Sequence, residues 1–185
     1  MTLEYTNTVE DIQAFNAYHY KHSPTMQRQR LNAQYAMTFL YAVAYGITVI
    51  LLAGGRPNAS PDLGVLYLGI GIAGAIVVFF ASRTHIESRF TRNVEKLYKE
   101  GKNTSLLEPR SVTIEADGIK HQSPSSEGNI KWSAVEKVVA TDTHLFLYIN
   151  AMAAIAIPKR APSNESDWND LVKRAQTYQQ SAAIQ

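Results

Sequence analysis

The 185-residue chain contains no cysteine, and its charges nearly cancel, with 18 Lys and Arg residues against 16 Asp and Glu residues. The absence of cysteine excludes disulfides, thiol catalysis and cysteine-ligated metal sites. A net charge of +2 provides no overall field that would attract nucleic acid, so no nucleic-acid partner is expected. The length suits one domain, or a small domain with an additional element.

Charge is also missing from two long stretches of the chain. Residues 31–55 and residues 63–82 contain no Asp, Glu, Lys, Arg or His. About 20 helical residues cross the hydrocarbon core of a bilayer, and segment 63–82 lacks the polar stripe of a soluble core helix. The sequence therefore predicts a transmembrane hairpin over residues 31–82, with spans at about 34–54 and 63–82. The alternative is a pair of buried core helices in a soluble protein.

The flanks of the spans predict their orientation. Residues Gly54–Asp62 include two glycines and two prolines, which favour a tight turn between the helices. Basic residues gather beside the spans on the side of the two termini: Lys21, Arg28, Arg30, Arg83, Arg89, Arg92, Lys96 and Lys99. The loop holds only Arg56. Because basic flanks stay cytoplasmic, we expect a two-pass protein of the inner membrane with both termini inside the cell.

Small residues within the spans suggest how the helices pack. Three pairs stand four positions apart: Ala42 with Gly46, Gly69 with Ala73, and Gly71 with Ala75. Such spacing lets helix backbones approach closely in lipid. Two interpretations remain open, contact within the hairpin and contact between two chains in a homodimer. Neither span holds an ionisable side chain, which argues against an ion pathway or a transport site.

The segments that flank the hairpin have different character. Residues 1–30 are expected to form a cytosolic strand and helix, with Thr8 capping the helix and Asp11 three positions on. Ser23-Pro24 ends or redirects that helix. His19 and His22 lack a nearby carboxylate, so no metal site is expected there. Residues 83–103 are expected to continue the second span as a basic helix. Its candidate lipid contacts are Arg83, Arg89, Arg92, Lys96 and Lys99, unless these charges only set the topology.

From residue 104 the apolar pattern takes a period of two, which predicts strands. Asp117-Gly118 marks a hairpin turn, and residues 144–150 predict a central strand. A final helix is expected after its cap at Asn164, with Trp168 and Leu171 on its apolar face. An antiparallel sheet closed by a C-terminal helix is the outline of a pleckstrin-homology-like module. The fold class is therefore an α+β membrane protein with a cytosolic domain over residues 104–185.

Four short motifs match a known family: Tyr5-Thr6 with Glu10-Asp11 and Phe15, Asp117-Gly118-Ile119, Trp132-Ser133-Ala134-Val135, and Ile157-Pro158-Lys159-Arg160. With the two spans between them, these motifs resemble the YcxB-like membrane proteins of bacteria. The resemblance implies a bacterial two-span protein with a cytosolic, pleckstrin-homology-like end. It brings no known reaction and no catalytic residues.

Catalytic motifs are absent from the sequence. It has no glycine-rich phosphate loop, no HExxH and no Gly-x-Ser-x-Gly. Asp142 and His144 stand two positions apart, but no nucleophile is tied to them by spacing, so a polar strand end is the better interpretation. We therefore expect no enzyme, no cofactor and no metal. Lys159 and Arg160 are candidates for a basic rim that contacts lipid headgroups or an acidic partner.

Two functions follow, and the charge of the last domain favours one. From Asn103 onward there are eight basic and nine acidic residues, too balanced to attract an anionic membrane. The first hypothesis is a membrane-tethered scaffold or regulator whose cytosolic domain binds a protein partner. The alternative is an anionic-lipid sensor that uses the basic helix after the second span.

Overall fold

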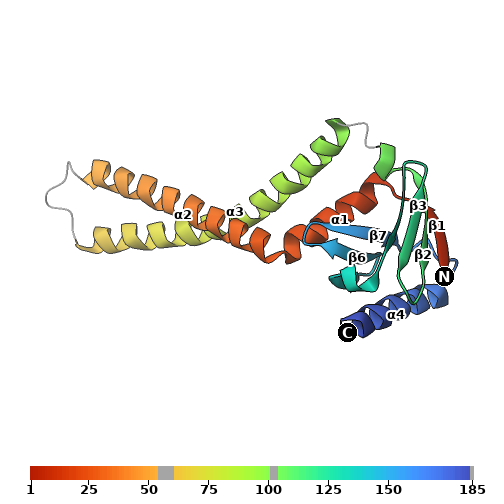
Figure 1. The fold of residues 1–185 in the computed structure, drawn as a ribbon. Coiled ribbons are helices and arrows are strands. Elements are labelled where there is room, and N and C mark those ends of the chain that lie inside the picture. The colour runs from red at the N-terminus through yellow and green to blue at the C-terminus, as the bar shows by residue number, and fades with distance from the viewer. Residues whose placement is uncertain (54–60, 101–103, 184–185) are drawn as a thin grey trace. The chain divides into compact units, whose positions relative to one another are not determined.

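A computed structural model describes residues 1–53, 61–100 and 104–183, and the chain divides into two compact units. We call Met1–His19 with Val94–Gln185 the sheet domain, and Tyr20–Asn93 the helical hairpin. The expected turn lies largely in residues 54–60, and the expected helix break largely in residues 101–103, so both predictions fall mostly outside the described residues. The fold is mixed α+β, as predicted (Figure 1).

The sheet domain contains two antiparallel sheets. The first has the strand order β1-β2-β3-β4 and consists of β1 (Thr2–Thr6), β2 (Pro109–Ile114), β3 (Ile119–Ser123) and β4 (Ser126–Ile130). The second has the order β5-β6-β7 and consists of β5 (Lys137–Ala140), β6 (His144–Asn150) and β7 (Ala153–Pro158). The central position of β6 confirms the prediction. The sequence predicted one antiparallel sheet over residues 104–185, but the strands form two sheets, with a 3₁₀ turn at Trp132–Ala134 between them in the chain.

The first strand comes from the other side of the hairpin in sequence. β1 pairs antiparallel with β2 in the register Thr2 with Thr113 and Thr6 with Pro109. Residues 1–30 were expected to form a segment apart from residues 104–185, and the structure differs on this point. Leu3 explains why, because it faces Val112 and is 5% exposed within the common core. The long apolar helices are thus an insertion between two neighbouring strands of one sheet.

Two helices complete the sheet domain. α1 (Val9–His22) begins after Thr8, as predicted. The Thr8 backbone N–H donates to the Asp11 carboxylate at 2.7 Å, which is the bond that position 11 supplies in a capping box. α4 (Glu165–Ala182) begins after Asn164, whose side chain accepts from the Asp167 N–H at 2.9 Å. α4 lies against β5, β2 and the 3₁₀ turn (Figure 1).

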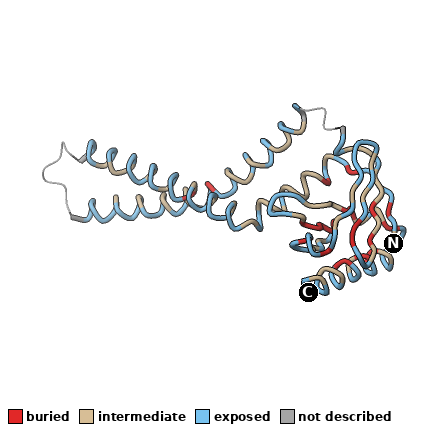
Figure 2. Tube along the Cα trace, in the orientation of Figure 1, coloured by how far each residue is buried: buried red, intermediate tan, exposed pale blue. Residues whose placement is uncertain are grey.

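The core lies between the two sheets and α4. Its fully buried members include Val112, Ile119, Leu147, Ile157 and Leu171. Along the strands the core positions alternate, as Val112 and Ile114 do on β2 and Leu145 and Leu147 on β6, because side chains two positions apart point to one face. Figure 2 shows that the buried residues gather in the sheet domain, while the long helices carry mostly exposed and half-buried residues.

Two glycines are fixed by close approach of the chain. A Cβ at Gly118 would lie 2.6 Å from the Ile130 carbonyl oxygen, so a side chain does not fit in the β2–β3 turn. A Cβ at Gly128 would lie 2.6 Å from the His121 ring, its cross-strand neighbour. The turn predicted at Asp117-Gly118 is confirmed, with the Glu115 N–H donating to the Gly118 carbonyl oxygen at 3.0 Å.

The helical hairpin consists of α2 (Pro24–Ala53) and most of α3 (Pro61–Glu100). α1 ends at His22 and α2 begins at Pro24, which confirms the break predicted at Ser23-Pro24. α3 also continues through the basic segment without interruption, as predicted. Both helices are long and apolar enough to cross a membrane, and the apolar windows contain no buried residue. The core-helix alternative therefore does not describe them, because core helices are buried.

The two long helices of the hairpin contact each other through polar groups as well as apolar ones. The Gln34 side-chain amide donates to the Phe79 carbonyl oxygen at 3.1 Å, and Gln34 is only 3% exposed. The Tyr45 hydroxyl donates to the Tyr67 carbonyl oxygen at 2.6 Å. Arg30 pairs with Glu87 at 3.0 Å. These bonds fix the register of α2 against α3.

Candidate functional site

A buried carboxylate joins three distant segments of the sheet domain. Asp11, in the first turn of α1, is 2% exposed. Its Oδ1 lies 2.9 Å from Nε2 of His144, at the start of β6, and 2.7 Å from Nη1 of Arg160, just after β7. Its Oδ2 accepts from Nη2 of Arg160 at 2.5 Å. We call these three residues the Asp11 cluster. It fastens α1 to the three-stranded sheet.

The partners of Asp11 keep it ionised. Burial alone would raise the pKa of Asp11, but hydrogen bonds from Arg160, the Thr8 N–H and His144 outweigh burial and hold that pKa well below its usual range. The same hydrogen bond raises the pKa of Arg160. A paired, hydrogen-bonded buried charge of this kind is costly to break because the remaining partner loses its compensation. The cluster is therefore a structural fastening with fixed charge.

Aromatic side chains continue the contact between α1 and the sheet. Phe15 lies 5.6 Å from both Phe146 and Tyr148, between ring centroids, and Tyr18 lies 5.6 Å from Phe146. Phe146 and Tyr148 stand on the β6 face opposite to Leu145 and Leu147. α1 thus covers the outer face of the second sheet, while the core fills its inner face. Burial raises the pKa of Tyr148 to about 12.

The structure brings only some of the sequence-based candidates together. Nε2 of His144 contacts Asp11 rather than Asp142. Lys159 pairs with Glu165 at 2.8 Å, and Arg160 pairs with Asp11. The positive charge of this proposed rim is therefore largely compensated within the domain. Within the described residues, no three His, Asp or Glu side chains gather as metal ligands.

The basic residues of α3 point into solvent. Arg83 pairs with Glu87 at 3.4 Å, whereas Arg89, Arg92 and Lys96 are exposed and make no ion pair with the part of the chain that is described. The intervals of three and four residues place Arg89, Arg92 and Lys96 on one side of the helix. The side chain of Lys99, the fifth candidate, lies outside the described residues.

The small residues of the hairpin fall into two groups. A Cβ at Gly71 would lie 2.6 Å from the Tyr45 ring, and a Cβ at Gly74 would lie 1.8 Å from the Tyr41 hydroxyl, so tyrosines of α2 lie directly on these glycines of α3. Gly46 and Gly69, in contrast, have open space where a Cβ would be. Ala42 is exposed and Ala75 is half-buried. Within the hairpin, α2 and α3 therefore contact each other where tyrosines of α2 pack on glycines of α3.

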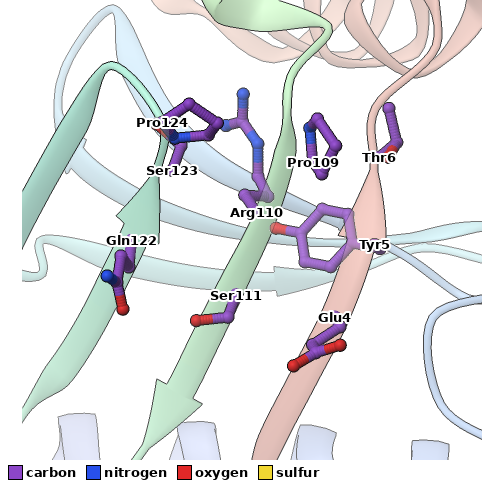
Figure 3. A pocket seen from close by; sticks show the side chains of 9 residues that line it. All are labelled: Glu4, Tyr5, Thr6, Pro109, Arg110, Ser111, Gln122, Ser123 and Pro124. Carbon is purple, nitrogen blue, oxygen red and sulfur yellow. The ribbon is translucent and has the colours of Figure 1, made fainter.

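An open cavity of about 580 Å³ lies at one end of the first sheet. Figure 3 shows Arg110 of β2 between Tyr5 of β1 and Ser123 of β3 at this end. The Tyr5 hydroxyl donates to the Ala156 carbonyl oxygen of β7 at 3.0 Å and so joins the two sheets. Burial raises the pKa of Tyr5, which keeps the hydroxyl protonated. Sequence reasoning missed Arg110, although its alternation with Val112 and Ile114 placed it on the core face.

The comparison with protein families agrees with the resemblance seen in the sequence. Residues 114–173 match the family model described as YcxB-like protein. No curated protein and no solved structure matches the chain. The matched residues run from the end of β2 to the middle of α4, and they include His144 and Arg160 of the Asp11 cluster. The match therefore covers a YcxB-like part of the sheet domain, and two long apolar helices precede it in the chain.

Proposed function

We propose that the chain is a two-span protein of the bacterial inner membrane whose cytosolic domain binds a protein partner at the membrane surface. The observation that carries this proposal is the pairing of β1 with β2 across the inserted hairpin. A domain that needs strands from both sides of the spans cannot leave the bilayer. Its function is therefore one that requires a fixed position at the membrane, as a scaffold or regulator does.

The pairing also supports the topology. Because Thr2–Thr6 and Pro109–Ile114 belong to one sheet, the chain ends that flank the spans lie on the same side of any membrane that both helices cross. The basic flanks assign that side to the cytoplasm. A reporter that is active only inside the cell, fused to either terminus, should give signal. A reporter that works only outside the inner membrane and gives signal at the C-terminus would contradict the proposal.

The architecture of the domain supports a pleckstrin-homology-like module. A four-stranded and a three-stranded antiparallel sheet enclose one core, and a C-terminal helix closes it. Modules of this outline commonly present their surfaces to other molecules rather than enclosing a substrate. The absence of catalytic motifs from the sequence fits a non-enzymatic role.

Charge favours a protein partner over lipid for the sheet domain. Of its eight basic residues after Asn103, four are paired with acids inside the domain: Lys120, Lys159, Arg160 and Arg174. Nine acidic residues balance the total. Binding to anionic lipid requires a net positive surface, with each charge contributing about 1 kcal/mol. The domain surface lacks that excess.

Cross-linking in intact cells, followed by purification of the full chain from membranes, tests the partner. We expect one protein to be enriched with the wild-type chain and lost with Val112→Asp, which disrupts the core while leaving both long helices unchanged. Glu4→Gln, an exposed change on β1, is the matched control and should retain the partner. If wild type and Val112→Asp recover the same amount of the partner protein, the sheet domain does not bind that partner.

Lipid sensing by α3 is the second candidate, favoured by the exposed row Arg89, Arg92 and Lys96. Since the chain has no cysteine, Leu97→Cys gives a single site for an environment-sensitive dye next to this row. If the row binds lipid, nanodiscs with anionic lipid should shift the emission to the blue, and exchange of the three residues for Gln should abolish the shift. If the emission spectra are equal in neutral and anionic nanodiscs, these charges do not bind lipid and serve only to set the membrane topology.

A further inference from the structure

A second, more enclosed cavity opens between the two sheets. It has a volume of about 300 Å³. Residues from both sheets line it, among them Arg110 of β2, Ile130 of β4 and Ile155 of β7. Val112, at its inner end, is fully buried and belongs to the core. The cavity is thus the open end of the space that the core fills elsewhere.

Polar side chains stand on the core face of the strands at this end. Arg110 shares its face of β2 with Val112 and Ile114, both of which are buried. His121 and Ser123 share their face of β3 with Ile119, which is fully buried. Core faces normally carry apolar residues unless a polar group has a partner there. A run of polar inward positions around a cavity therefore points to a ligand.

Arg110 has a buried donor without a hydrogen-bond partner in the described part of the chain. Its Nη2 donates to the carbonyl oxygens of Ser105 at 3.1 Å and Leu106 at 2.9 Å, which fixes the guanidinium in place. Its Nε is buried and has no hydrogen-bond partner within the described residues. Buried donors are rarely left unpaired. The neighbouring Tyr5 hydroxyl donates to Ala156 and does not fill the role of acceptor.

The rim and floor of the cavity restrict what the acceptor is. Ser125 lines the cavity, and its hydroxyl and N–H donate to the Glu108 carboxylate at 2.6 Å and 3.2 Å. One guanidinium beside one carboxylate suits a monoanion better than a phosphate dianion. The floor is apolar, with Ile130, Ile149 and Ile155. A volume of about 300 Å³ is at the lower end of small-molecule sites.

We propose that this cavity binds a small amphiphilic monocarboxylate, whose carboxylate accepts from the Arg110 guanidinium and whose apolar tail packs on the three isoleucines. Carboxylates are preferred acceptors of arginine donors, and charge-assisted hydrogen bonds are the stronger ones. The ligand goes beyond the proposed partner and does not depend on it. Cross-linking tests binding of the protein partner and NMR tests binding of the carboxylate ligand, so failure of one proposal is distinguishable from failure of the other.

Methyl NMR of the full chain in zwitterionic nanodiscs tests the proposal, with hexanoate as the probe and isoleucine methyls labelled. Hexanoate should shift the methyl signals of Ile130, Ile149 and Ile155 with saturation. Ile47 and Ile76 of the hairpin report partition into lipid and should move only linearly, as the probe does with empty nanodiscs. 1-Hexanol, which has the tail without the charge, should bind at least about tenfold more weakly.

Two variants decide the role of the arginine. Arg110→Gln should weaken hexanoate binding at least about tenfold, while Arg174→Gln, the same change at an exposed site on α4, should leave binding unchanged. If Arg110→Gln does not fold, Ser126→Phe at the exposed mouth keeps Arg110 and should block the probe. Wild-type affinity in Arg110→Gln or Ser126→Phe, equal binding of hexanol, or tighter binding of hexyl phosphate would each overturn the proposal.

Discussion

The sheet domain and the helical hairpin place the same residue types in opposite surroundings. In the domain, Val112, Leu147 and Leu171 are fully buried by other parts of the chain. In the hairpin, Leu51 is 76% exposed and Val65 is 72% exposed. Burial of a Val or Leu side chain is worth about 1.5–3 kcal/mol. The domain gains this free energy from its own core, whereas the hairpin requires an apolar environment that the chain does not supply, which is the role we propose for the bilayer.

The polar contacts of the two regions differ in the same way. In the domain, polar groups join segments far apart in sequence, as Asp11 does with Arg160, 149 residues away. In the hairpin they satisfy backbone acceptors between two adjacent helices, as Gln34 does with Phe79. The domain should therefore unfold as a unit when one segment is removed, and the hairpin should tolerate most single changes. Four predictions test this contrast, and both tryptophans, Trp132 and Trp168, are buried in the domain and report on it alone.

Removal of β1 should have the largest effect. Deletion of residues 1–7 leaves β2 without its neighbour and removes Leu3 from the core, so the domain should lose its cooperative unfolding transition in tryptophan fluorescence. Residues 104–185 alone should behave in the same way. Residues 1–22 joined to 104–185 by a flexible Gly-Ser linker should recover the transition. A cooperative transition in residues 104–185 alone would show that β1 is dispensable and that the domain is complete after the spans.

Truncation of a core side chain should come next. Leu171→Ala in α4 should lower the free energy of unfolding of the domain by roughly 2–5 kcal/mol, because it leaves a cavity beneath the helix. The matched change Leu51→Ala in α2 should leave that free energy unchanged, because the side chain touches no core. Denaturant titration of the full chain in nanodiscs measures both. If Leu171→Ala and Leu51→Ala lower the free energy of unfolding equally, the sheet domain and the hairpin do not differ in the way described.

The Asp11 cluster should contribute less than the core, and its contribution should depend on pH. Asp11→Asn should cost about 2–3 kcal/mol at pH 7, since it removes a buried, hydrogen-bonded charge. The pKa of Asp11 in the folded chain lies below the value of about 3.9 expected in the unfolded chain. The stabilisation is therefore present above about pH 4 and is lost as the pH falls towards the lower, folded value.

The pH series supplies its own control. The difference in unfolding free energy between wild type and Asp11→Asn should be constant from about pH 5 to 7 and should shrink at lower pH. A difference that instead grows as the solution becomes acidic would contradict the assigned direction. Glu4→Gln, an exposed change on β1, controls for general loss of one negative charge.

The smallest effect should come from the hairpin itself. Gly71→Leu forces a side chain against the Tyr45 ring and should cost about 1–3 kcal/mol of contact between α2 and α3. Gly69→Leu meets open space and should cost nothing within the hairpin. Spin labels at Leu51→Cys and Leu63→Cys would report the helix separation. A change in separation with Gly69→Leu would indicate that this face has a partner, such as a second chain.

Local patterns predicted much of the fold. The charge-free stretches gave both long helices, and the caps at Thr8 and Asn164 gave the starts of α1 and α4. These signals reside in residues three or four positions apart, where one hydrogen bond decides the local conformation. The unbroken run of apolar residues along β6 also predicted its central place, because a strand buried on both faces carries apolar residues at successive positions.

Long-range partners could not be found in the same way. Nothing near Asp11 indicates that its carboxylate meets His144 and Arg160, and the nearer Asp142 was the only acid that spacing could offer to His144. Likewise, the alternation of Leu3 and Tyr5 predicted a strand without a neighbour. The neighbour, β2, follows more than a hundred residues later, and the intervening helices disguise the continuity of the sheet. A single sequence contains the period of a strand but not the identity of its pair.

The insertion of the hairpin between β1 and β2 also imposes an order on biosynthesis. β1 leaves the ribosome first, but its partner β2 begins only at Pro109. At about 5–20 residues per second, the first strand waits for several seconds at least before it can pair. During that interval both apolar helices emerge and become available to the insertion machinery. The domain thus completes its fold only after the hairpin has been synthesised. In the membrane protein that we propose, the hairpin could therefore reach the bilayer before the sheet domain has folded.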